Sequence, residues 1–172
     1  MLLEKRVAVV IPAYREERLV ARVLARQPDW IDTIVVVDDG SPDHTYAAAC
    51  EAARCDDRVQ VIRLAFNQGV GAAIMRGYAR ATREGAEVIA VMAGDDQMDP
   101  DELANVCLPV ARGEAGYAKG NRLTHPEAHR MPWLRRAGTR ALGRVTGLIA
   151  GVPGLDDAQC GYTAVSTEAL AR

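Results

Sequence analysis

The sequence predicts an α/β fold, with a mostly parallel, Rossmann-related sheet and helices on both faces. Short continuous apolar runs, which are typical of strands buried on both sides, recur through the first half of the chain. Segments with helical spacing of apolar residues lie between these runs, and this alternation favours helices on both sheet faces. Polar clusters follow several of the runs, at the sheet edge where open α/β sheets bind ligands.

The individual elements follow from these patterns in chain order. The first apolar run covers residues 6–11 and is ended by Pro12, and residues 16–26 carry apolar side chains at helical spacing. Continuing in the same way, the sequence predicts strands over 32–37, 58–64 and 86–91, and helices over 43–55, 72–84 and 101–112. The pattern loosens after Gly113, where residues 117–122 are compatible with a short strand that has a polar end.

Length and composition predict one globular domain over residues 1–172, with 49% hydrophobic and 26% charged residues. A net charge of -2 argues against a nucleic-acid partner. No apolar run approaches the roughly 20 residues that span a bilayer, and residues 1–6 do not resemble a signal peptide. We therefore expect a cytoplasmic protein. Residues 167–172 resemble an unfinished helix, so a truncated C-terminus is an open alternative.

Residues 92–100 form the most informative segment, because acid and amide side chains gather directly after a predicted strand. Hard oxygen ligands at such an edge suit Mg²⁺ or Mn²⁺, and such a cation suits a phosphate-bearing substrate. The alternative is a loop that caps the next helix, with Asp99 as N-cap and Pro100 at the first helical position. Both interpretations can hold, because helix capping uses Asp99 and leaves Asp95 and Gln97 available to bind a metal.

Three polar clusters follow the first, second and fourth predicted strands and are expected to face one crevice. They occupy residues 12–17, 38–41 and 92–100. Helix capping and acids in a first helical turn explain part of this pattern. The adjacent acid pairs Asp38-Asp39 and Asp95-Asp96 exceed what capping needs, and they are costly unless a cation or hydrogen-bond donors compensate. Residues 67–71 lack a phosphate-loop motif and are either a tight helix entry or a ligand contact.

Six segments, in this order, resemble a family 2 glycosyltransferase with the GT-A fold. They are residues 10–17, 35–41, 67–71, 94–100, 120–122 and 157–162. The similarity covers nearly the whole chain and is strongest to the dolichyl- and polyprenyl-phosphate sugar synthases. It implies an inverting transfer of a sugar from a UDP- or GDP-linked donor, with Mg²⁺ or Mn²⁺, to an acceptor such as a polyprenyl phosphate.

The resemblance also assigns roles to particular positions. The nucleotide-binding positions would be Pro12, Ala13, Tyr14, Glu16, Asp38 and Asp39. Asp95 would be catalytic and would bind the metal together with Gln97, in the family's D-x-D-x-Q pattern. The chain departs from that pattern at Ala93, so the metal site is expected to be weaker unless Asp96 or the diphosphate supplies the missing ligand. A second departure is Arg15, where the family commonly has asparagine.

The acceptor side is expected around residues 130–144, the basic region of the chain. Its helix-spaced arginines are Arg136, Arg140 and Arg144. This face is either a solvated side of a core-packed helix or an interfacial helix that meets anionic lipid at the cytoplasmic membrane face. The resemblance implies that Arg122, Arg135 and Thr139 bind the acceptor phosphate, and that Asp157 is a catalytic base or an acceptor contact.

Two other functions remain open from the sequence. Ala93 and the early end of the chain are compatible with a non-catalytic module that binds a nucleotide-sugar or a lipid. A metal-dependent nucleotidyltransferase uses a similar sheet and metal. Such an enzyme usually carries a glycine-rich basic loop after its first strand, where this chain has residues 12–16.

Overall fold

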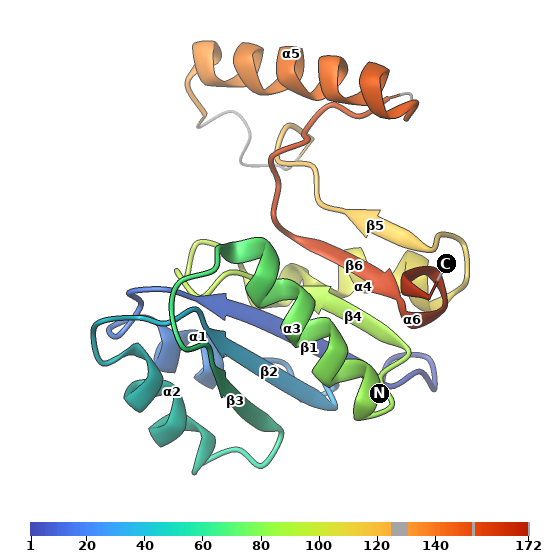
Figure 1. The fold of residues 1–172 in the computed structure, drawn as a ribbon. Helices are drawn as coiled ribbons and strands as arrows, with labels where there is room; N and C mark the ends of the chain where they lie inside the picture. Colours follow the sequence, from blue (N-terminus) through green and yellow to red (C-terminus); the bar gives the residue numbers. More distant parts are fainter. Residues whose placement is uncertain (125–130, 153, 172) are drawn as a thin grey trace. The chain divides into compact units, whose positions relative to one another are not determined.

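The computed structural model describes residues 1–124, 131–152 and 154–171. The chain divides into two compact units, residues 1–118 with 162–172, and residues 119–161. The first unit contains the sheet and the second contains one long helix (Figure 1). The expectation of a single domain over the whole chain stays a prediction.

The sheet has six strands in the order β3-β2-β1-β4-β6-β5. Their bounds are β1 Val7–Ala13, β2 Thr33–Asp38, β3 Val59–Arg63, β4 Val88–Val91, β5 Tyr117–Lys119 and β6 Thr163–Ser166. Strands β1 to β4 are mutually parallel where they pair, and β6 runs antiparallel to β4. The predicted α/β class with a mostly parallel sheet is therefore confirmed.

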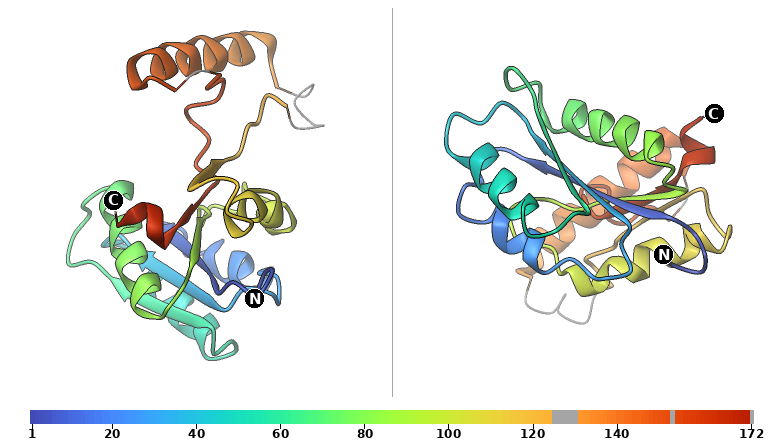
Figure 2. Two further views of the ribbon diagram at one scale, coloured as in Figure 1. Left: turned by 90° about the vertical axis from the view of Figure 1, so that its right-hand side faces the viewer. Right: turned by 90° about the horizontal axis from the view of Figure 1, so that it is seen from below.

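Helices cover both faces of this sheet (Figure 2). The helices of the first unit are α1 Val20–Ala25, α2 Thr45–Ala53, α3 Val70–Arg83, α4 Leu103–Ala111 and α6 Thr167–Leu170, with a 3₁₀ turn η1 at Pro100–Glu102. Helices α3 and α6 lie on one face, while α1, α2 and α4 lie on the other (Figure 2). Helix α3 packs closely on β1, because a Cβ added at Gly77 would lie 2.2 Å from a methyl carbon of Val10.

The apolar runs form the core as expected, since Val7–Ile11 of β1 are fully buried. The predicted helix over 16–26 is shorter in the structure. It starts at Val20, because the amides of Leu19 and Val20 both donate to the carbonyl of Glu16 and form a turn first. No strand was expected at β6, whose four residues carry no alternating pattern. It forms by pairing with β4.

The strand order places a switch point at β1. Strand β2 lies on one side of β1 and β4 on the other, with α1 and α3 on opposite faces. In such sheets, the connections leave the carboxyl ends of the two central strands in opposite directions and leave a crevice between them. This rule predicts that the segments following β1 and β4 border the ligand-binding region.

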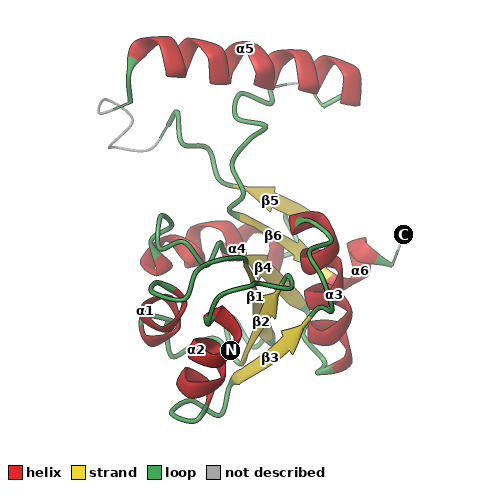
Figure 3. Ribbon diagram, turned by 60° about the vertical axis from the view of Figure 1, so that its left-hand side comes forward, coloured by secondary structure: helices red, strands yellow, loops and turns green. Residues whose placement is uncertain are grey.

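The second unit is built on α5, Trp133–Ala150, one uninterrupted helix (Figure 3). Its buried face consists of the small residues Thr139, Gly143 and Gly147, which recur every four positions. Val152, Leu155 and Asp156 lie directly against this face, since a Cβ added at Gly143 would lie 2.2 Å from the carbonyl oxygen of Asp156 and one at Gly147 would lie 2.7 Å from that of Val152. No helix among the described residues is both long and apolar enough to cross a membrane.

Candidate active site

Backbone hydrogen bonds join the three polar clusters at the strand ends. The carbonyl of Ala13 accepts from the amide of Asp39 at 2.9 Å, and the carbonyl of Pro12 accepts from the amide of Gly94 at 3.3 Å. The amide of Glu16 donates to the Thr45 hydroxyl at 2.8 Å. The clusters after β1, β2 and β4 therefore form one continuous surface, as the sequence predicted.

Asp38 is a fully buried carboxylate with one open acceptor. Its Oδ1 accepts from the amide of Ser41 at 3.1 Å. Its Oδ2 has no hydrogen-bond partner, although Nε of Arg63 lies 3.3 Å away at ion-pair distance. Arg63 in turn donates to the Ser41 carbonyl and lies over the Tyr46 ring. A buried acceptor without a donor is unfavourable, so Oδ2 is suited to accept from a ligand N–H.

Asp39 has a different environment, because both of its oxygens are engaged within the protein. They accept from the amides of Gln68 at 2.7 Å and Gly69 at 2.8 Å. The neighbouring Gly40 has φ +65 and approaches the Phe66 backbone so closely that a Cβ there would lie 2.5 Å from its carbonyl carbon. Asp39 thus holds the 67–69 loop in place, and a direct nucleotide contact from it stays a prediction.

Negative charge gathers where the segments after β1, β2 and β4 meet. The pKa of Glu16 is raised, first by burial and then by the nearby carboxylates of Asp95 and Asp43. Asp95 accepts from the amide of Gln97 through Oδ1 at 3.1 Å, which leaves Oδ2 for another partner. A divalent cation would relieve this repulsion. The described residues contain no group of three or more acidic, histidine or cysteine side chains placed to hold a metal, so Asp95 and Gln97 form a partial set of ligands within this part of the chain.

The Asp96 side chain, one candidate for the carboxylate that Ala93 lacks, is engaged with two arginines in this conformation. Its oxygens pair with Arg22 at 2.7 Å and Arg26 at 3.3 Å. Its backbone has φ +58, in the left-handed region. Asp96 as a replacement ligand stays a prediction, and it would require these ion pairs to open.

The capping interpretation of the same segment is confirmed. The Asp99 side chain accepts from the amide of Asp101 at the start of η1, and Pro100 occupies the first helical turn. Asp99 also pairs with Arg26 at 3.0 Å, and its carbonyl accepts from the hydroxyl of Tyr162 at 2.8 Å. Burial raises the pKa of that hydroxyl, which keeps it a donor.

In the second unit, Arg122 and Asp157 bind each other. Arg122 Nε and Nη2 donate to the two carboxylate oxygens at 2.8 and 2.9 Å, and the amides of Arg122 and Gln159 donate as well. The Asp157 side chain is fully buried, and its hydrogen bonds with Arg122 lower its pKa. Asp157 is therefore an ionised anchor for Arg122. Arg135 is exposed and precedes the buried Thr139 by one turn of α5.

Four residues were not singled out from the sequence, although the structure places them beside the candidate site: Arg22, Arg26, Arg63 and Tyr162. The first two lie four positions apart, a spacing that puts them on one side of α1. Tyr162 belongs to one of the six family-like segments. No sequence pattern indicated a site role for Arg63, because it is the last residue of an ordinary strand. It lies next to Asp38 because of the pairing register of β2 and β3.

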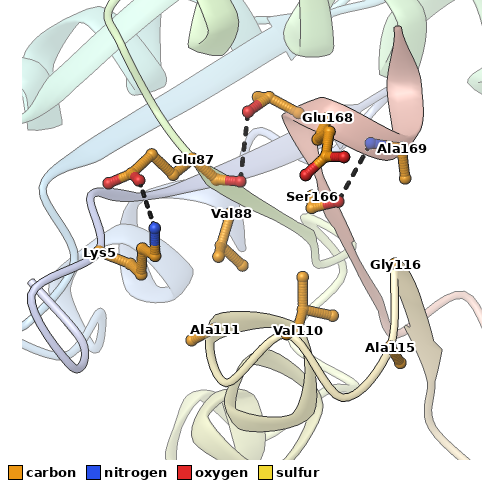
Figure 4. Close-up of a pocket in the computed structure, with 12 residues that line it drawn as sticks. Lys5, Glu87, Val88, Val110, Ala111, Ala115, Gly116, Ser166, Glu168 and Ala169 are labelled. Atoms are coloured by element: carbon orange, nitrogen blue, oxygen red, sulfur yellow. Dashed lines mark hydrogen bonds and ion pairs between the residues drawn. The ribbon is translucent and has the colours of Figure 1, made fainter. Parts of the chain in front are cut away.

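A cavity of about 430 Å³ lies at the opposite edge of the sheet and is not a candidate active site (Figure 4). Lys5 there is paired with Glu87 at 2.7 Å. Thr167 donates to the Glu87 carbonyl, and the Ser166 hydroxyl accepts from the amide of Ala169. These polar groups of the lining are engaged with one another and not with a shared point inside the cavity.

Comparison with known proteins identifies the family to which this sheet and its strand-end clusters belong. The family model Glycosyl transferase family 2 matches residues 8–170. A UDP-N-acetylglucosamine–dolichyl-phosphate N-acetylglucosaminyltransferase of Methanococcus voltae is 32% identical over 97% of this chain and 72% of its own. A polyprenol monophosphomannose synthase of Mycolicibacterium smegmatis is 34% identical over 96% of this chain and 63% of its own.

Solved structures show the same fold. Glucosyl-3-phosphoglycerate synthase of Mycobacterium tuberculosis, crystallised with Mn²⁺, UDP and glucosyl-3-phosphoglycerate, matches with a TM-score of 0.72 at 20% identity, over 96% of this chain and 58% of its own. A mannosyltransferase of Pyrobaculum calidifontis with GDP-mannose and Mn²⁺ matches with a TM-score of 0.57 at 25% identity, over 66% and 34%. The chain belongs to glycosyltransferase family 2 and has the GT-A fold.

Proposed function

We propose that this family 2 glycosyltransferase moves a sugar, with inversion, from a UDP- or GDP-linked donor to a polyprenyl phosphate. The observation that carries the donor side is the switch point at β1. There, Asp38 has a buried carboxylate with an open acceptor. At the same edge of the sheet, the carboxylates of Glu16 and Asp95 lie near enough to each other to interact. The curated relatives named for dolichyl-phosphate and polyprenol substrates support the choice of acceptor.

The chemistry follows from charge. An anionic phosphate oxygen of the acceptor attacks the anomeric carbon. A carbon–oxygen bond forms on one face while the bond to the diphosphate breaks on the other, and the nucleoside diphosphate leaves with the electron pair. Asp95 and Gln97 would hold a Mg²⁺ or Mn²⁺ together with the diphosphate, and that cation would supply charge neutralisation of the leaving group. The acceptor phosphate is already ionised, so it needs little help from a base such as Asp157.

A panel of nucleotide-sugars tests the proposal. Calorimetry with UDP- and GDP-linked sugars, each with and without Mn²⁺, identifies the base and the metal requirement. Radiolabelled transfer to a short polyprenyl phosphate then tests the reaction itself. Nucleotide-sugar binding without turnover on any lipid phosphate would favour the non-catalytic module, which is motivated by Ala93. Activity that persists in chelator would remove the metal from the proposal.

Asp38→Asn is expected to weaken nucleoside diphosphate binding by about 1.5–3 kcal/mol, the range for a hydrogen bond to a charged group. Asparagine can still accept from the Ser41 amide but can present a donor where Oδ2 accepts. Calorimetry measures the loss, and thermal unfolding verifies the fold. The control is Asp57→Asn, an exposed carboxylate outside the site. Unchanged affinity in a folded Asp38→Asn protein would sink the assignment.

Helix α5 is proposed to lie on the anionic cytoplasmic surface of the membrane. This helix exposes large apolar side chains, including Trp133 at 78%, Leu148 at 85% and Ile149 at 83%. Its charged residues are all arginines, namely Arg135, Arg136, Arg140 and Arg144. An exposed apolar face combined with arginines and no acids matches an anionic lipid surface.

Vesicle flotation tests this placement. The protein should bind anionic vesicles more strongly than neutral ones, and added salt should weaken the binding by screening. Leu148→Ser/Ile149→Ser should weaken it by at least about tenfold, since each buried side chain contributes roughly 1.5–3 kcal/mol. The control Val70→Ser/Met75→Ser removes exposed apolar residues from α3 instead. Equal flotation of both double variants would contradict a docking role for α5.

A further inference from the structure

We propose that Arg22 and Arg26 position the metal-binding residues Asp95 and Gln97, by holding Asp96 and Asp99 against α1. This inference rests on the proposed function, because it concerns how the candidate metal site is built. Neither arginine would touch the metal or the substrate. Both would act through the loop that follows β4.

The two ends of that loop are anchored by other contacts. At its start, the amide of Gly94 donates to the Pro12 carbonyl at 3.3 Å. At its end, the Tyr162 hydroxyl donates to the Asp99 carbonyl at 2.8 Å, and the Asp99 side chain caps η1. Residues 95–97, which carry the candidate ligands, lie between these anchors.

The middle of the loop depends on Asp96. Among the described residues, Asp96 contacts the rest of the protein through its ion pairs with Arg22 at 2.7 Å and Arg26 at 3.3 Å. The Asp95 side chain contacts the amide of Gln97, two residues away in the same loop. The arginines therefore provide the external attachment of the ligand-bearing segment.

Asp96 also has an unfavourable backbone conformation that needs support. Its φ of +58 lies in the left-handed region, which aspartate tolerates only moderately. This turn lets the adjacent carboxylates serve different partners: Asp96 faces α1, while Asp95 is near enough to Glu16 to raise its pKa. Losing the ion pairs would free the chain to leave this conformation and carry Asp95 with it.

Helix α1, to which the loop is attached, is held in place by packing in the core. Its Val20, Val23 and Leu24 are buried in the core. The Gln27 side chain, just after α1, donates to the Val23 carbonyl at 2.9 Å and lies 3.9 Å from the sulfur of Met92 at the end of β4. Exposed ion pairs are individually weak, but Asp96 is only 15% exposed and shares two arginines, so its network is better shielded from solvent. The missing acid at Ala93 makes the placement of the remaining ligands more critical.

The test uses the variant Arg22→Gln/Arg26→Gln, with Arg83→Gln/Arg112→Gln as a control for lost charge. Calorimetry measures Mn²⁺ binding with saturating UDP or GDP, and hydrogen exchange measures the amides of residues 95–98. We expect Mn²⁺ to bind on the order of tenfold more weakly, which is about 1.4 kcal/mol. Amide exchange should accelerate in the same loop, while nucleotide binding in chelator stays unchanged. Arg22→Lys/Arg26→Lys should restore part of the Mn²⁺ affinity.

Unchanged exchange at residues 95–98 in the folded glutamine variant would overturn the inference. Unchanged Mn²⁺ affinity, or an equal loss in the control variant, would do the same. If the unmodified protein binds no Mn²⁺ with either nucleotide, the metal requirement of the proposed function fails instead. Hydrogen exchange would still decide whether the arginines hold the loop.

Discussion

Asp95→Asn is expected to lower the rate of sugar transfer by about 10²- to 10³-fold, the range seen when one stabilising group at a developing charge is removed. Asp95 is the remaining acid of the family's metal pattern, because the other position is Ala93. Asparagine is nearly isosteric, and its carbonyl can still accept from the Gln97 amide, so the loop should keep its shape. The fall in transfer rate would therefore measure the effect of removing the negative charge of Asp95.

Steady-state kinetics at several Mn²⁺ and Mg²⁺ concentrations measure this effect. The unmodified protein should bind Mn²⁺ weakly without nucleotide, because the phosphates complete the coordination shell. Asp101→Asn, at an exposed acid just beyond the loop, is the matched control and should retain activity. A fully active Asp95→Asn enzyme would show that the metal is held elsewhere or is not used.

The sequence predicted those parts of the site in which a polar cluster directly follows the end of a strand. The ends of β1, β2 and β4 fall at or within two residues of the predicted positions, because each apolar run gives way to polar residues that a buried strand excludes. Asp38, Glu16 and Asp95 follow from that rule. The sequence also predicted that these three residues lie close together, because the carboxyl ends of parallel strands meet at one edge of the sheet.

Contacts between distant side chains could not be predicted in the same way. Arg22 and Asp96 are separated by 74 positions (96 minus 22), and no periodic pattern links them. Asp39 looks identical to Asp38 in sequence, yet the sheet buries one with an open acceptor and turns the other onto the amides of Gln68 and Gly69. The register decides which neighbour is available to each side chain.

The role of Asp157 shows the same limit and leads to a second prediction. Sequence resemblance suggested a base or an acceptor contact, whereas the structure gives it four hydrogen bonds and a lowered pKa, chiefly from Arg122. A depressed carboxyl pKa contributes stability above the unfolded value, near 3.8, and loses it as pH falls through the lower folded value. The Arg122–Asp157 pair should therefore stay intact across neutral and mildly acidic pH.

Arg122→Gln is expected to lower kcat/KM for the lipid-phosphate acceptor by on the order of 10²- to 10³-fold, because it removes the charge proposed to hold the acceptor phosphate. Nucleotide binding should be spared. Asp157→Asn should mainly raise KM for the acceptor, because it releases Arg122, and it should leave the shape of the pH–rate profile unchanged. Arg112→Gln, at an exposed arginine near Glu114, is the control.

The pH profile separates the two roles of Asp157. A catalytic base would produce an acidic limb that disappears in Asp157→Asn, along with most of kcat. An anchor for Arg122 would change KM instead, and its effect would not add to that of Arg122→Gln, because both variants remove the same interaction. Loss of the acidic limb in a folded Asp157→Asn enzyme would show that Asp157 acts as a catalytic base. Additive effects of the two variants would show that Arg122 binds the acceptor without help from Asp157.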